Sequence, residues 1–519
     1  MEQLIHSGVL VPKYDARGFR IYFRGEEMTL DPEQEEMAVA WVKKLGTEYA
    51  EDETFVKNFF QDFAQVVHRD GATLKDFDFS EIQHFITEDR NRKLAMSKEV
   101  RKQEAKKRKA IREMNREKYG YAVVDGVRVE VGNYMVEPSS IFMGRGQHPL
   151  RGRWKRGVKG NEVTLNLSPD APIPSGDWKE VVWQPESMWI AKWCDNLGGK
   201  TKYVWLSDTS HIKQKRDIEK FDKARELNSR LEQVRTHILK NLNSSDPMRR
   251  KIATVCYLID VLKFRVGDEK DKDEADTVGA TTLRPEHLSF RSEGLVVFDF
   301  LGKDSVHWHL EKKLDEPVIR NIKESINDTS TPIFKGVRSN KVSAFLDEVL
   351  PRLTAKVFRT FYATNIVRAG LVNAKVSNDS DEIEKKFVAT MANLEAAKTC
   401  NHKKKISKNW NKTLEKMDDS LTKYKDLLGE VKAKKTLKKA VKRRRLKALE
   451  NRIKNAQIKI EIKRATRDYN LNTSLKSYID PRTYYQWGNK IGFDWKQYYP
   501  KTLQRKFLWV EDEKEERMD

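Results

Sequence analysis

The sequence contains little cysteine. Only Cys194, Cys256 and Cys400 occur among 519 residues, and no two of them form a CxxC pair. Three thiols cannot all pair, and their spacing suits neither a zinc module nor a disulfide-rich secreted domain. We therefore expect reduced thiols and a cytosolic or nuclear setting.

Long apolar runs and common cofactor motifs are also absent from the sequence. No stretch approaches the roughly 18 apolar residues of a membrane helix, and the N-terminus MEQLIHSGVLVPKYD lacks the regions of a signal peptide. There is no GxxxxGK[ST] loop, no HExxH and no carboxylate cluster for two metals. The acidic stretch 267–276 lacks EF-hand spacing, which favours a solvated loop. We expect an intracellular protein with no membrane partner, and the sequence offers no P-loop for ATP and no zinc or two-metal motif.

Positive charge and hydrophobic residues are plentiful. The chain has 100 Lys and Arg against 78 Asp and Glu, a formal net charge of +22, and 38% hydrophobic residues. This length and composition predict two to four folding units with packed cores. The excess positive charge points to a polyanionic partner, most simply nucleic acid.

Patterning divides the chain into five expected parts. Residues 1–95 combine a strand pair, GFRIYFRGEEMTL, with helical periodicity. A basic helical run extends from about residue 86 to about residue 118 and so crosses into the second part. The rest of that second part, residues 96–210, is rich in strands. Residues 211–405 are mainly helical, with a strand insertion at EGLVVFDFLGKDSVHWHL. Residues 406–467 predict a helical hairpin, and residues 468–519 form a small tyrosine-rich segment.

The hairpin prediction depends on two short heptad-like seams separated by the basic stretch KKTLKKAVKRRRLK. Apolar residues at alternating three- and four-residue steps favour two helices that pack against each other as an antiparallel coiled coil. The seam residues are Leu414, Met417, Leu421, Tyr424, Leu428, Val431, Leu446, Leu449, Ile453, Ala456 and Ile460.

Several basic residues lie beside apolar elements, and each has a plain structural interpretation when taken alone. They are Arg265 in VLKFRVGDEK, Lys303 in FDFLGKDS, Arg359 in KVFRTF and His402 in KTCNHKKK. An arginine at a helix end usually caps carbonyls, a lysine in a tight turn is usually exposed, and a lone histidine is more often structural than catalytic. Tyr478, in SYIDPR, is either a packing residue or a nucleophile.

A family resemblance separates these interpretations. FVKNFFQDF, FMGRGQHP, RVGDEKDKDEADTVGATTLRPEHL, FDFLGKDS, LTAKVFRTF, CNH and SYIDPR…W…YYPKTLQRKFLW occur in this order. From about residue 5 onward the chain resembles the eukaryotic-type DNA topoisomerase IB family. The resemblance implies relaxation of supercoiled duplex DNA by transient single-strand cleavage, without ATP or a required metal. It also implies an α+β multidomain clamp with a mixed α/β cap, a mainly helical catalytic domain with a small sheet, a coiled-coil linker and a small helical C-terminal domain.

The resemblance also implies roles for individual residues. Tyr478 would form a 3′-phosphotyrosine, Arg265, Arg359 and His402 would stabilise the phosphate oxygens, and Lys303 would protonate the leaving 5′-oxygen. The remaining tyrosines of the segment, Tyr484, Tyr485, Tyr498 and Tyr499, would then be packing residues.

Further contacts are implied to DNA and to camptothecin. Arg145 and Lys202 would contact DNA near the cleavage site, and the loops at MGRGQHP and Asp273–Ala275 would be the two lips of the clamp. Arg145, Asp304 and Ser477 would line the drug pocket, with serine where camptothecin-sensitive members have asparagine.

The implied state is a monomer clamped around duplex DNA, located with chromosomal DNA: in the nucleus of a eukaryote, or in the cytoplasm and nucleoid of an archaeon. The resemblance begins close to Met1 and the hairpin is shorter than in animal members. Both features suggest a compact member from an archaeon or a similar lineage.

Two alternatives share some of these features. A tyrosine site-specific recombinase has the same catalytic set, but recombinases normally place His-x-x-Arg where this chain has Lys356-Val-Phe-Arg359, and they lack a long hairpin before the tyrosine. A basic coiled-coil protein that coats nucleic acid would account for the charge and the hairpin, but not for the separate active-site motifs.

Overall fold

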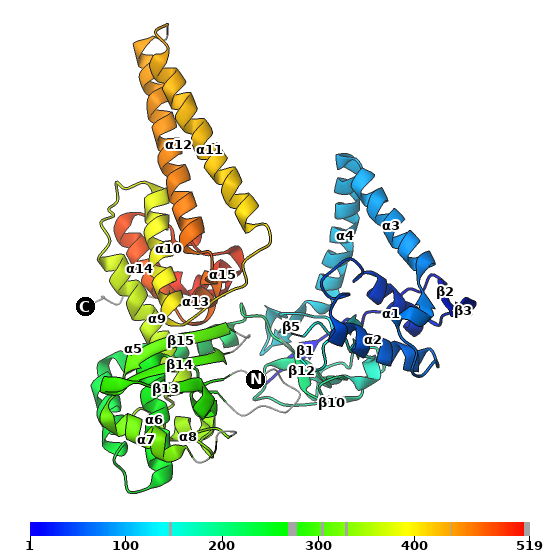
Figure 1. Cartoon of the computed structure of the whole chain (residues 1–519), viewed down its shortest axis with the longest axis horizontal. Helices are drawn as coiled ribbons and strands as arrows, with labels where there is room; N and C mark the ends of the chain where they lie inside the picture. Colours follow the sequence, from blue (N-terminus) through cyan, green and yellow to red (C-terminus); the bar gives the residue numbers. More distant parts are fainter. Residues whose placement is uncertain are drawn as a thin grey trace. The chain divides into compact units, whose positions relative to one another are not determined.

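The computed structural model describes residues 1–144, 148–267, 278–302, 306–326, 328, 331–436 and 438–512. These residues form two compact units, and the division falls between Gln214 and Lys215 in the sequence. Both units combine helices with small sheets, so the expected mixture of α and β structure is confirmed (Figure 1).

The N-terminal unit contains four small sheets, with strand orders β3-β2-β4, β1-β5-β6, β7-β8 and β10-β9-β11-β12. In chain order its elements are β1 (Leu4–His6), β2 (Arg20–Phe23), β3 (Glu26–Thr29), α1 (Pro32–Val42), α2 (Glu53–Val66), β4 (Phe77–Asp78), α3 (Ser80–Ala95), α4 (Lys98–Tyr119), β5 (Tyr121–Val124), β6 (Val127–Glu130), β7 (Ser140–Ile141), β8 (Trp154–Lys155), β9 (Thr164–Asn166), β10 (Glu180–Val182), β11 (Trp189–Cys194) and β12 (Thr201–Trp205).

The predicted strand pair near the N-terminus is confirmed. β2 and β3 pair antiparallel through Arg24 and Gly25, whose φ angles of 50° and 90° are those a two-residue hairpin turn requires. α1 begins after Asp31, whose carboxylate accepts two backbone N–H groups, and Pro32 occupies the first helical position. Phenylalanines of α2 pack with Trp41 to form the core of this region.

The basic helical run differs from the single helix expected over residues 86–118. The structure has two helices, α3 and α4, with a break at Met96 and Ser97. The Ser97 side chain accepts the N–H of Val100, which starts a new helix at Lys98. The N-cap signal of this serine was hidden within an otherwise continuous charged pattern.

The second unit is mainly helical, and its described residues include a sheet of order β13-β14-β15. Its elements are α5 (His211–Asn241), which begins just before the division, α6 (Pro247–Leu262), β13 (Leu288–Phe290), β14 (Leu295–Gly302), β15 (Val306–Lys313), α7 (Glu316–Ser325), α8 (Ser339–Asp347), α9 (Ala355–Val372), α10 (Glu382–Thr399), α11 (Trp410–Ala433), α12 (Lys439–Ala465), α13 (Leu471–Ser477), α14 (Pro481–Ile491) and α15 (Lys501–Lys506).

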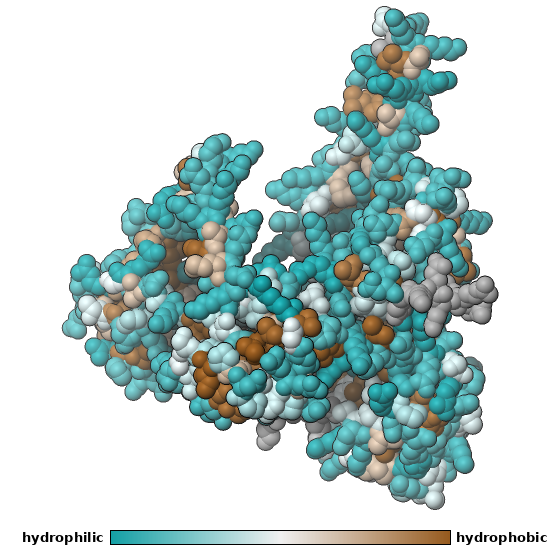
Figure 2. All heavy atoms as spheres, turned by 180° about the vertical axis from the view of Figure 1, so that it is seen from behind, coloured by the Kyte–Doolittle hydropathy of each residue, from teal (hydrophilic) through white to brown (hydrophobic). Residues whose placement is uncertain are grey.

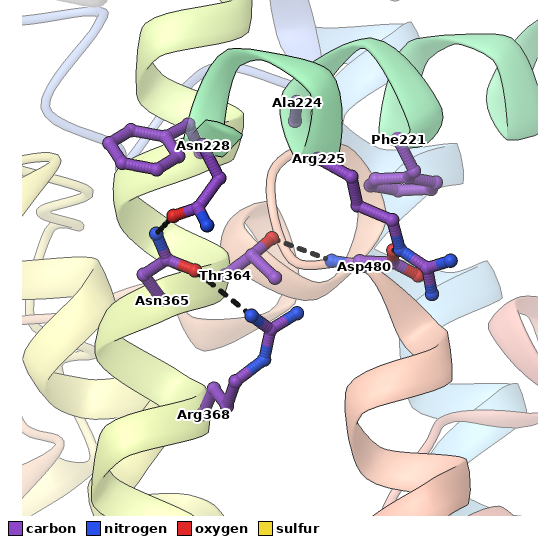
Figure 3. A pocket seen from close by; sticks show the side chains of 9 residues that line it. Phe221, Ala224, Arg225, Asn228, Thr364, Asn365, Arg368 and Asp480 are labelled. Carbon is purple, nitrogen blue, oxygen red and sulfur yellow. Dashed lines mark hydrogen bonds and ion pairs between the residues drawn. The ribbon is translucent and has the colours of Figure 1, made fainter. Parts of the chain in front are cut away.

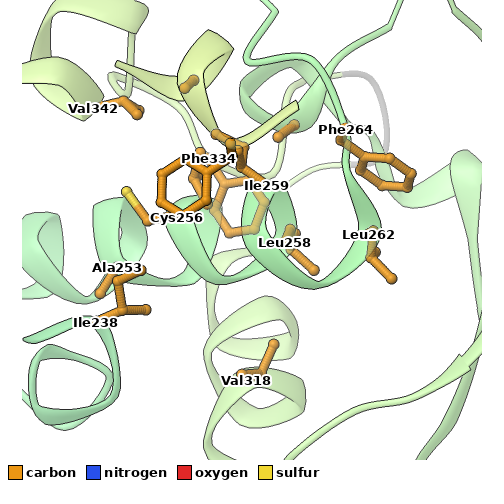
Figure 4. Close-up of a cluster of buried hydrophobic side chains, with 14 of the residues drawn as sticks. Ile238, Ala253, Cys256, Leu258, Ile259, Leu262, Phe264, Val318, Phe334 and Val342 are labelled. Atoms are coloured by element: carbon orange, nitrogen blue, oxygen red, sulfur yellow. The ribbon is translucent and has the colours of Figure 1, made fainter. Parts of the chain in front are cut away.

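The core of the second unit is built around α6. Cys256, Leu258 and Ile259 of this helix are fully buried, and Phe334 and Val318 pack over them from neighbouring segments (Figure 4). A second cluster of buried residues joins α9 and α10 to the C-terminal segment. The two clusters fix α9 between them, and α9 carries one of the candidate site residues.

α11 and α12 form the predicted antiparallel hairpin. Near its base Arg464 pairs with Asp418 at 3.2 Å, and at its tip the Lys442 ammonium donates to the carbonyls of Lys432 and Lys434. Every predicted seam residue is buried or half-buried, whereas hydrophilic side chains cover most of the outer hairpin surface (Figure 2). The heptad-like pattern therefore selected residues on the less exposed faces of the two helices, and packing of these residues as a coiled coil stays a prediction.

All three cysteines are unpaired, as expected: Cys194 is exposed, and Cys256 and Cys400 are buried. Among the described helices, none has both the length and the apolar character needed to cross a bilayer.

Candidate active site

Tyr478 lies directly after α13, where the helix ends. Its N–H donates to the Ser474 carbonyl at 2.9 Å, and its φ of −130° leaves the helical region. The side chain is 8% exposed, and its ring stacks on the His402 ring with the centroids 5.0 Å apart. The candidate nucleophile is thus a mostly buried phenol held against an imidazole.

Arg359 of α9 is the most deeply buried cation near this phenol, with 1% of its surface exposed. It donates to the Lys263 carbonyl at 3.0 Å and the Cys400 carbonyl at 2.7 Å, and its guanidinium carbon lies 5.0 Å from the Tyr478 ring centroid. Its Nε is buried, and no acceptor for it occurs in the described part of the chain. A buried N–H without an acceptor costs free energy, and an incoming anion could satisfy it.

His402 is placed by a left-handed turn at Asn401, which has a φ of 50°. Its Nε2 lies 3.1 Å from Nη2 of Arg359, and its Nδ1 lies 2.7 Å from Oγ of Ser474. Because a guanidinium only donates, Nε2 must be the acceptor, so the proton of the neutral ring is on Nδ1. Burial, followed by the charges of Arg359 and Arg265, lowers the pKa of His402 to about 3. The ring is therefore neutral at physiological pH.

Arg265 follows α6 and belongs to the same cluster. Burial lowers the pKa of its guanidinium, Arg359 lowers it further, and the Tyr478 phenol raises it. Its loop is held by a close approach of Gly267 to Gly279, where a Cβ on Gly279 would lie 2.5 Å from the Gly267 Cα. Two guanidinium groups thus face one phenol in a partly desolvated site, which favours binding of an anion.

The backbone after Tyr478 is fixed from α9. The Thr364 hydroxyl donates to the Tyr478 carbonyl at 3.3 Å and accepts the Asp480 N–H at 3.0 Å. Asp480 caps α14 and pairs with Arg225 of α5 at 3.3 Å. Thr364, Asp480 and Arg225 line a small cavity of about 60 Å³, together with Arg368 (Figure 3). The backbone that follows the candidate nucleophile is therefore held by α9 and α5.

The His402 loop is tied to the β14–β15 sheet. Asn401 Nδ2 and Lys403 Nζ donate to the His307 carbonyl at 3.1 and 3.4 Å. Lys303 and Asp304, predicted as the general acid and a drug contact, fall between these strands in the sequence and lie outside the described residues.

Arg265, Arg359, His402 and Tyr478 thus come together from four separate segments of the second unit. In the ranges that the structure describes, no group of three or more His, Cys, Asp or Glu side chains is arranged to hold a metal ion.

Comparison with known proteins gives a consistent family match. The family model for the catalytic core of eukaryotic DNA topoisomerase I matches residues 209–436, that for its DNA binding fragment matches residues 1–206, and that for a C-terminal topoisomerase domain matches residues 450–518. DNA topoisomerase 1 of Rattus norvegicus is 31% identical over 98% of this chain and 70% of its own length. The chain belongs to the eukaryotic DNA topoisomerase I family.

Other relatives are longer than this chain. DNA topoisomerase 1 beta of Arabidopsis thaliana is 34% identical over 98% of the chain and 58% of its own length, and DNA topoisomerase 1 of Drosophila melanogaster is 30% identical over 98% and 54%. The chain therefore spans a little over half the length of these topoisomerases. The relatives come from plants, animals and yeasts, so the expectation of an archaeal source has no support among them.

The predicted DNA and drug contacts Arg145, Lys202 and Ser477 lie within the matched ranges. Lys202 lies on β12 within the DNA binding fragment, where its side chain is 42% exposed and its ammonium lies 3.7 Å from Asp195. Arg145 lies in the same fragment but outside the described residues. Ser477, at the end of α13, is half-buried.

Two further residues of the candidate site, Ser474 and Thr364, were not predicted from the sequence. Ser474 contacts His402, and Thr364 holds the backbone around Tyr478. Ser474 precedes Tyr478 by about one helical turn, so a helix ending at the tyrosine would have placed both on one face. No sequence signal distinguishes Thr364 from the other polar residues of α9.

Proposed function

We propose that the chain is a type IB DNA topoisomerase that relaxes supercoiled duplex DNA through transient cleavage of one strand. The observation that carries this proposal is the gathering of Arg265, Arg359, His402 and Tyr478 in one buried cluster of a chain from this family. The excess of basic residues supports DNA as the partner.

In the first step, the Tyr478 oxygen attacks a backbone phosphate, forms a 3′-phosphotyrosine and displaces the 5′-oxygen. A phenol is a weak nucleophile at neutral pH, and nearby positive charge favours its ionised form. Arg359 and Arg265 supply this charge. Their guanidinium forks suit the non-bridging oxygens, on which negative charge grows in the transition state.

Lys303 is the proposed general acid. It gives a proton to the 5′-oxygen as the phosphorus–oxygen bond breaks, because an alkoxide is a poor leaving group. Religation reverses the step: the 5′-hydroxyl returns its proton to Lys303 as its oxygen attacks the phosphotyrosine, and Tyr478 leaves as the phenolate. The covalent bond conserves the energy of the cleaved linkage, so neither step requires ATP or a metal ion.

The five parts of the sequence receive proposed roles in this scheme. Residues 1–95 and 96–210 are the two cap modules, residues 211–405 the catalytic core domain, residues 406–467 a coiled-coil linker, and residues 468–519 the domain that carries the nucleophile. A monomer would close around the duplex as a clamp, with the loops near Arg145 and Asp273–Ala275 as its lips, and Lys202 on the DNA. Most contacts should be to phosphates and therefore sensitive to salt. The eukaryotic relatives favour action on chromosomal DNA in the nucleus.

A plasmid assay tests the proposal. We expect relaxation of any supercoiled circle in EDTA without ATP, and a protein–DNA adduct that denaturant traps. Strand exchange restricted to defined sites would instead indicate a tyrosine recombinase. DNA binding without any covalent adduct would instead favour a basic coiled-coil protein that coats nucleic acid.

A further inference from the structure

The buried imidazole of His402 has only one N–H to offer. It faces the guanidinium groups of Arg359 and Arg265, and burial and these charges disfavour a second proton on the ring. A neutral imidazole carries a proton on one nitrogen and a lone pair on the other. From this neutral form, a hydrogen bond from Nε2 of His402 to a phosphate requires the ring proton to lie on Nε2.

The contacts of His402 in the structure instead require the other neutral tautomer, with the ring proton on Nδ1. Nε2 accepts a hydrogen bond from Arg359 at 3.1 Å, so the ring proton is on Nδ1 and is donated to the Ser474 hydroxyl at 2.7 Å. Ser474 is fully buried, and within the described residues no second partner of Nδ1 occurs. If Nδ1 loses its proton, the Ser474 hydroxyl is therefore the described group that can donate a hydrogen bond to it.

A hydroxyl can either donate or accept, which an alanine at this position could not do. When a phosphate draws the Arg359 guanidinium onto its oxygens, Nε2 loses its donor. The ring can then carry its proton on Nε2 if the Ser474 hydroxyl turns and donates to Nδ1. One proton leaves Nδ1 and one is bound at Nε2 by exchange with water, so the charge of the ring does not change.

We propose that Ser474 is a positioning residue that reverses its hydrogen bond with Nδ1 and so allows neutral His402 to donate from Nε2 to the scissile phosphate. This inference rests on the proposed topoisomerase function. It is supported by a second connection to the nucleophile, because the Ser474 carbonyl accepts the N–H groups of Tyr478 and Ile479 at 2.9 and 3.0 Å. One residue thus holds both the imidazole and the end of the helix that presents the phenol.

Nitrogen NMR of the full chain with 15N-labelled histidine tests the proton position without requiring activity. In the free wild-type protein we expect His402 Nδ1 to carry the proton. Binding of duplex DNA to the Tyr478→Phe variant should move the proton to Nε2. In Ser474→Ala the DNA-dependent exchange should be lost. A His402 proton that stays on Nδ1 when DNA binds would overturn the proposal.

Single-turnover cleavage at saturating DNA supplies the second test. We expect Ser474→Ala to lower the cleavage rate by about tenfold or more, because a positioned donor is lost in the transition state. DNA affinity should stay within about threefold, since most of it comes from phosphate contacts elsewhere. Ser474→Thr should restore much of the rate, and Ser474→Cys, with its weak S–H donor, should be intermediate. Ser325→Ala, a buried serine of α7 in the same unit, is the matched control and should cleave at the wild-type rate.

The outcomes separate this inference from the function on which it rests. A wild-type protein that forms no adduct would refute the topoisomerase proposal. An active wild type with an equally fast, folded Ser474→Ala variant would refute only the role of Ser474. If Ser474→Ala and Ser325→Ala had equal defects, the slower cleavage would reflect a general loss of packing. That result would also refute the proposed role of Ser474.

Discussion

Tyr478 and Tyr484 belong to the same C-terminal segment and are both buried, yet their surroundings are of opposite kinds. Tyr478 stacks on an imidazole and lies near the guanidinium of Arg359. Tyr484 is 1% exposed, donates to the Ala389 carbonyl at 3.0 Å and packs against the rings of Tyr498 and Tyr499. One phenol faces cations, and the other faces rings and a carbonyl.

This comparison shows that burial by itself does not identify a nucleophile. Burial raises the pKa of Tyr484 well above its ordinary value and keeps that phenol protonated, and its neighbours Tyr498 and Tyr499 add to the shift. Tyr478 instead has the guanidinium of Arg359 beside its ring. The electrostatic surroundings, rather than the depth of the side chain, distinguish the proposed nucleophile from a packing residue.

The largest expected effect comes from Tyr478→Phe, which removes only the phenolic oxygen. Relaxation and adduct formation should both disappear, because no other oxygen can take its place. DNA affinity by gel shift should remain within a few-fold of wild type, since phosphate contacts dominate binding. Residual relaxation by the purified variant would assign the nucleophile to another residue.

Lys303→Ala should have the next largest effect. Loss of a general acid slows reactions by about 10²–10⁴-fold. A substrate with a 5′-bridging phosphorothiolate has a leaving group that needs no proton, so the variant should cleave it at nearly the wild-type rate. If the defect were equal on both substrates, Lys303 would act through charge or DNA binding and not as the acid.

Several helices and strands were predictable from periodicity, because a three-and-four step of apolar residues suits a helix and strict alternation suits a strand. The residues that the heptad steps selected in α11 and α12 are half-buried or buried, and the β2–β3 pair follows from alternation around a Gly turn. The break between α3 and α4 was missed, since charge repeats throughout that stretch and one serine cap decides where the second helix starts.

The active site was only partly predictable. Arg359, His402 and Tyr478 were predicted from motif resemblance; they lie close together in the structure, and their catalytic roles stay predictions. Ser474 and Thr364 were not identified, because their roles depend on contacts between segments that are distant in the sequence. Local patterns describe faces of helices and strands, whereas a hydroxyl that bridges two segments is visible only after folding.

Ser477→Asn tests the predicted drug contact beside Tyr478. Ser477 lies directly before Tyr478 at the end of α13. Serine is shorter than asparagine and lacks its amide, so one hydrogen bond to camptothecin should be missing from the wild type. A hydrogen bond of about 1–1.5 kcal/mol corresponds to roughly tenfold in affinity. We expect intrinsic resistance of the wild type, and about ten times more sensitivity in Ser477→Asn when the trapped covalent complex is titrated with drug. Equal sensitivity of the two proteins would exclude this role of Ser477.

The smallest expected effect is that of Tyr484→Phe, the matched partner of Tyr478→Phe. The substitution keeps the ring that packs against Tyr498 and Tyr499 and removes one hydrogen bond to the Ala389 carbonyl. Such a bond contributes about 0.5–1.5 kcal/mol, and the free energy of unfolding should fall by that amount, as a shift of the denaturant midpoint at constant slope.

Relaxation and adduct formation by Tyr484→Phe should match the wild type, because the described contacts of this phenol are with the Ala389 carbonyl and the rings of Tyr498 and Tyr499. The pair of Tyr→Phe variants therefore removes the same atom from two buried tyrosines of one segment. If Tyr484→Phe lost adduct formation while its denaturant midpoint stayed close to wild type, the division between a chemical and a packing tyrosine would be wrong. Loss of stability without loss of chemistry is the result that the two environments predict.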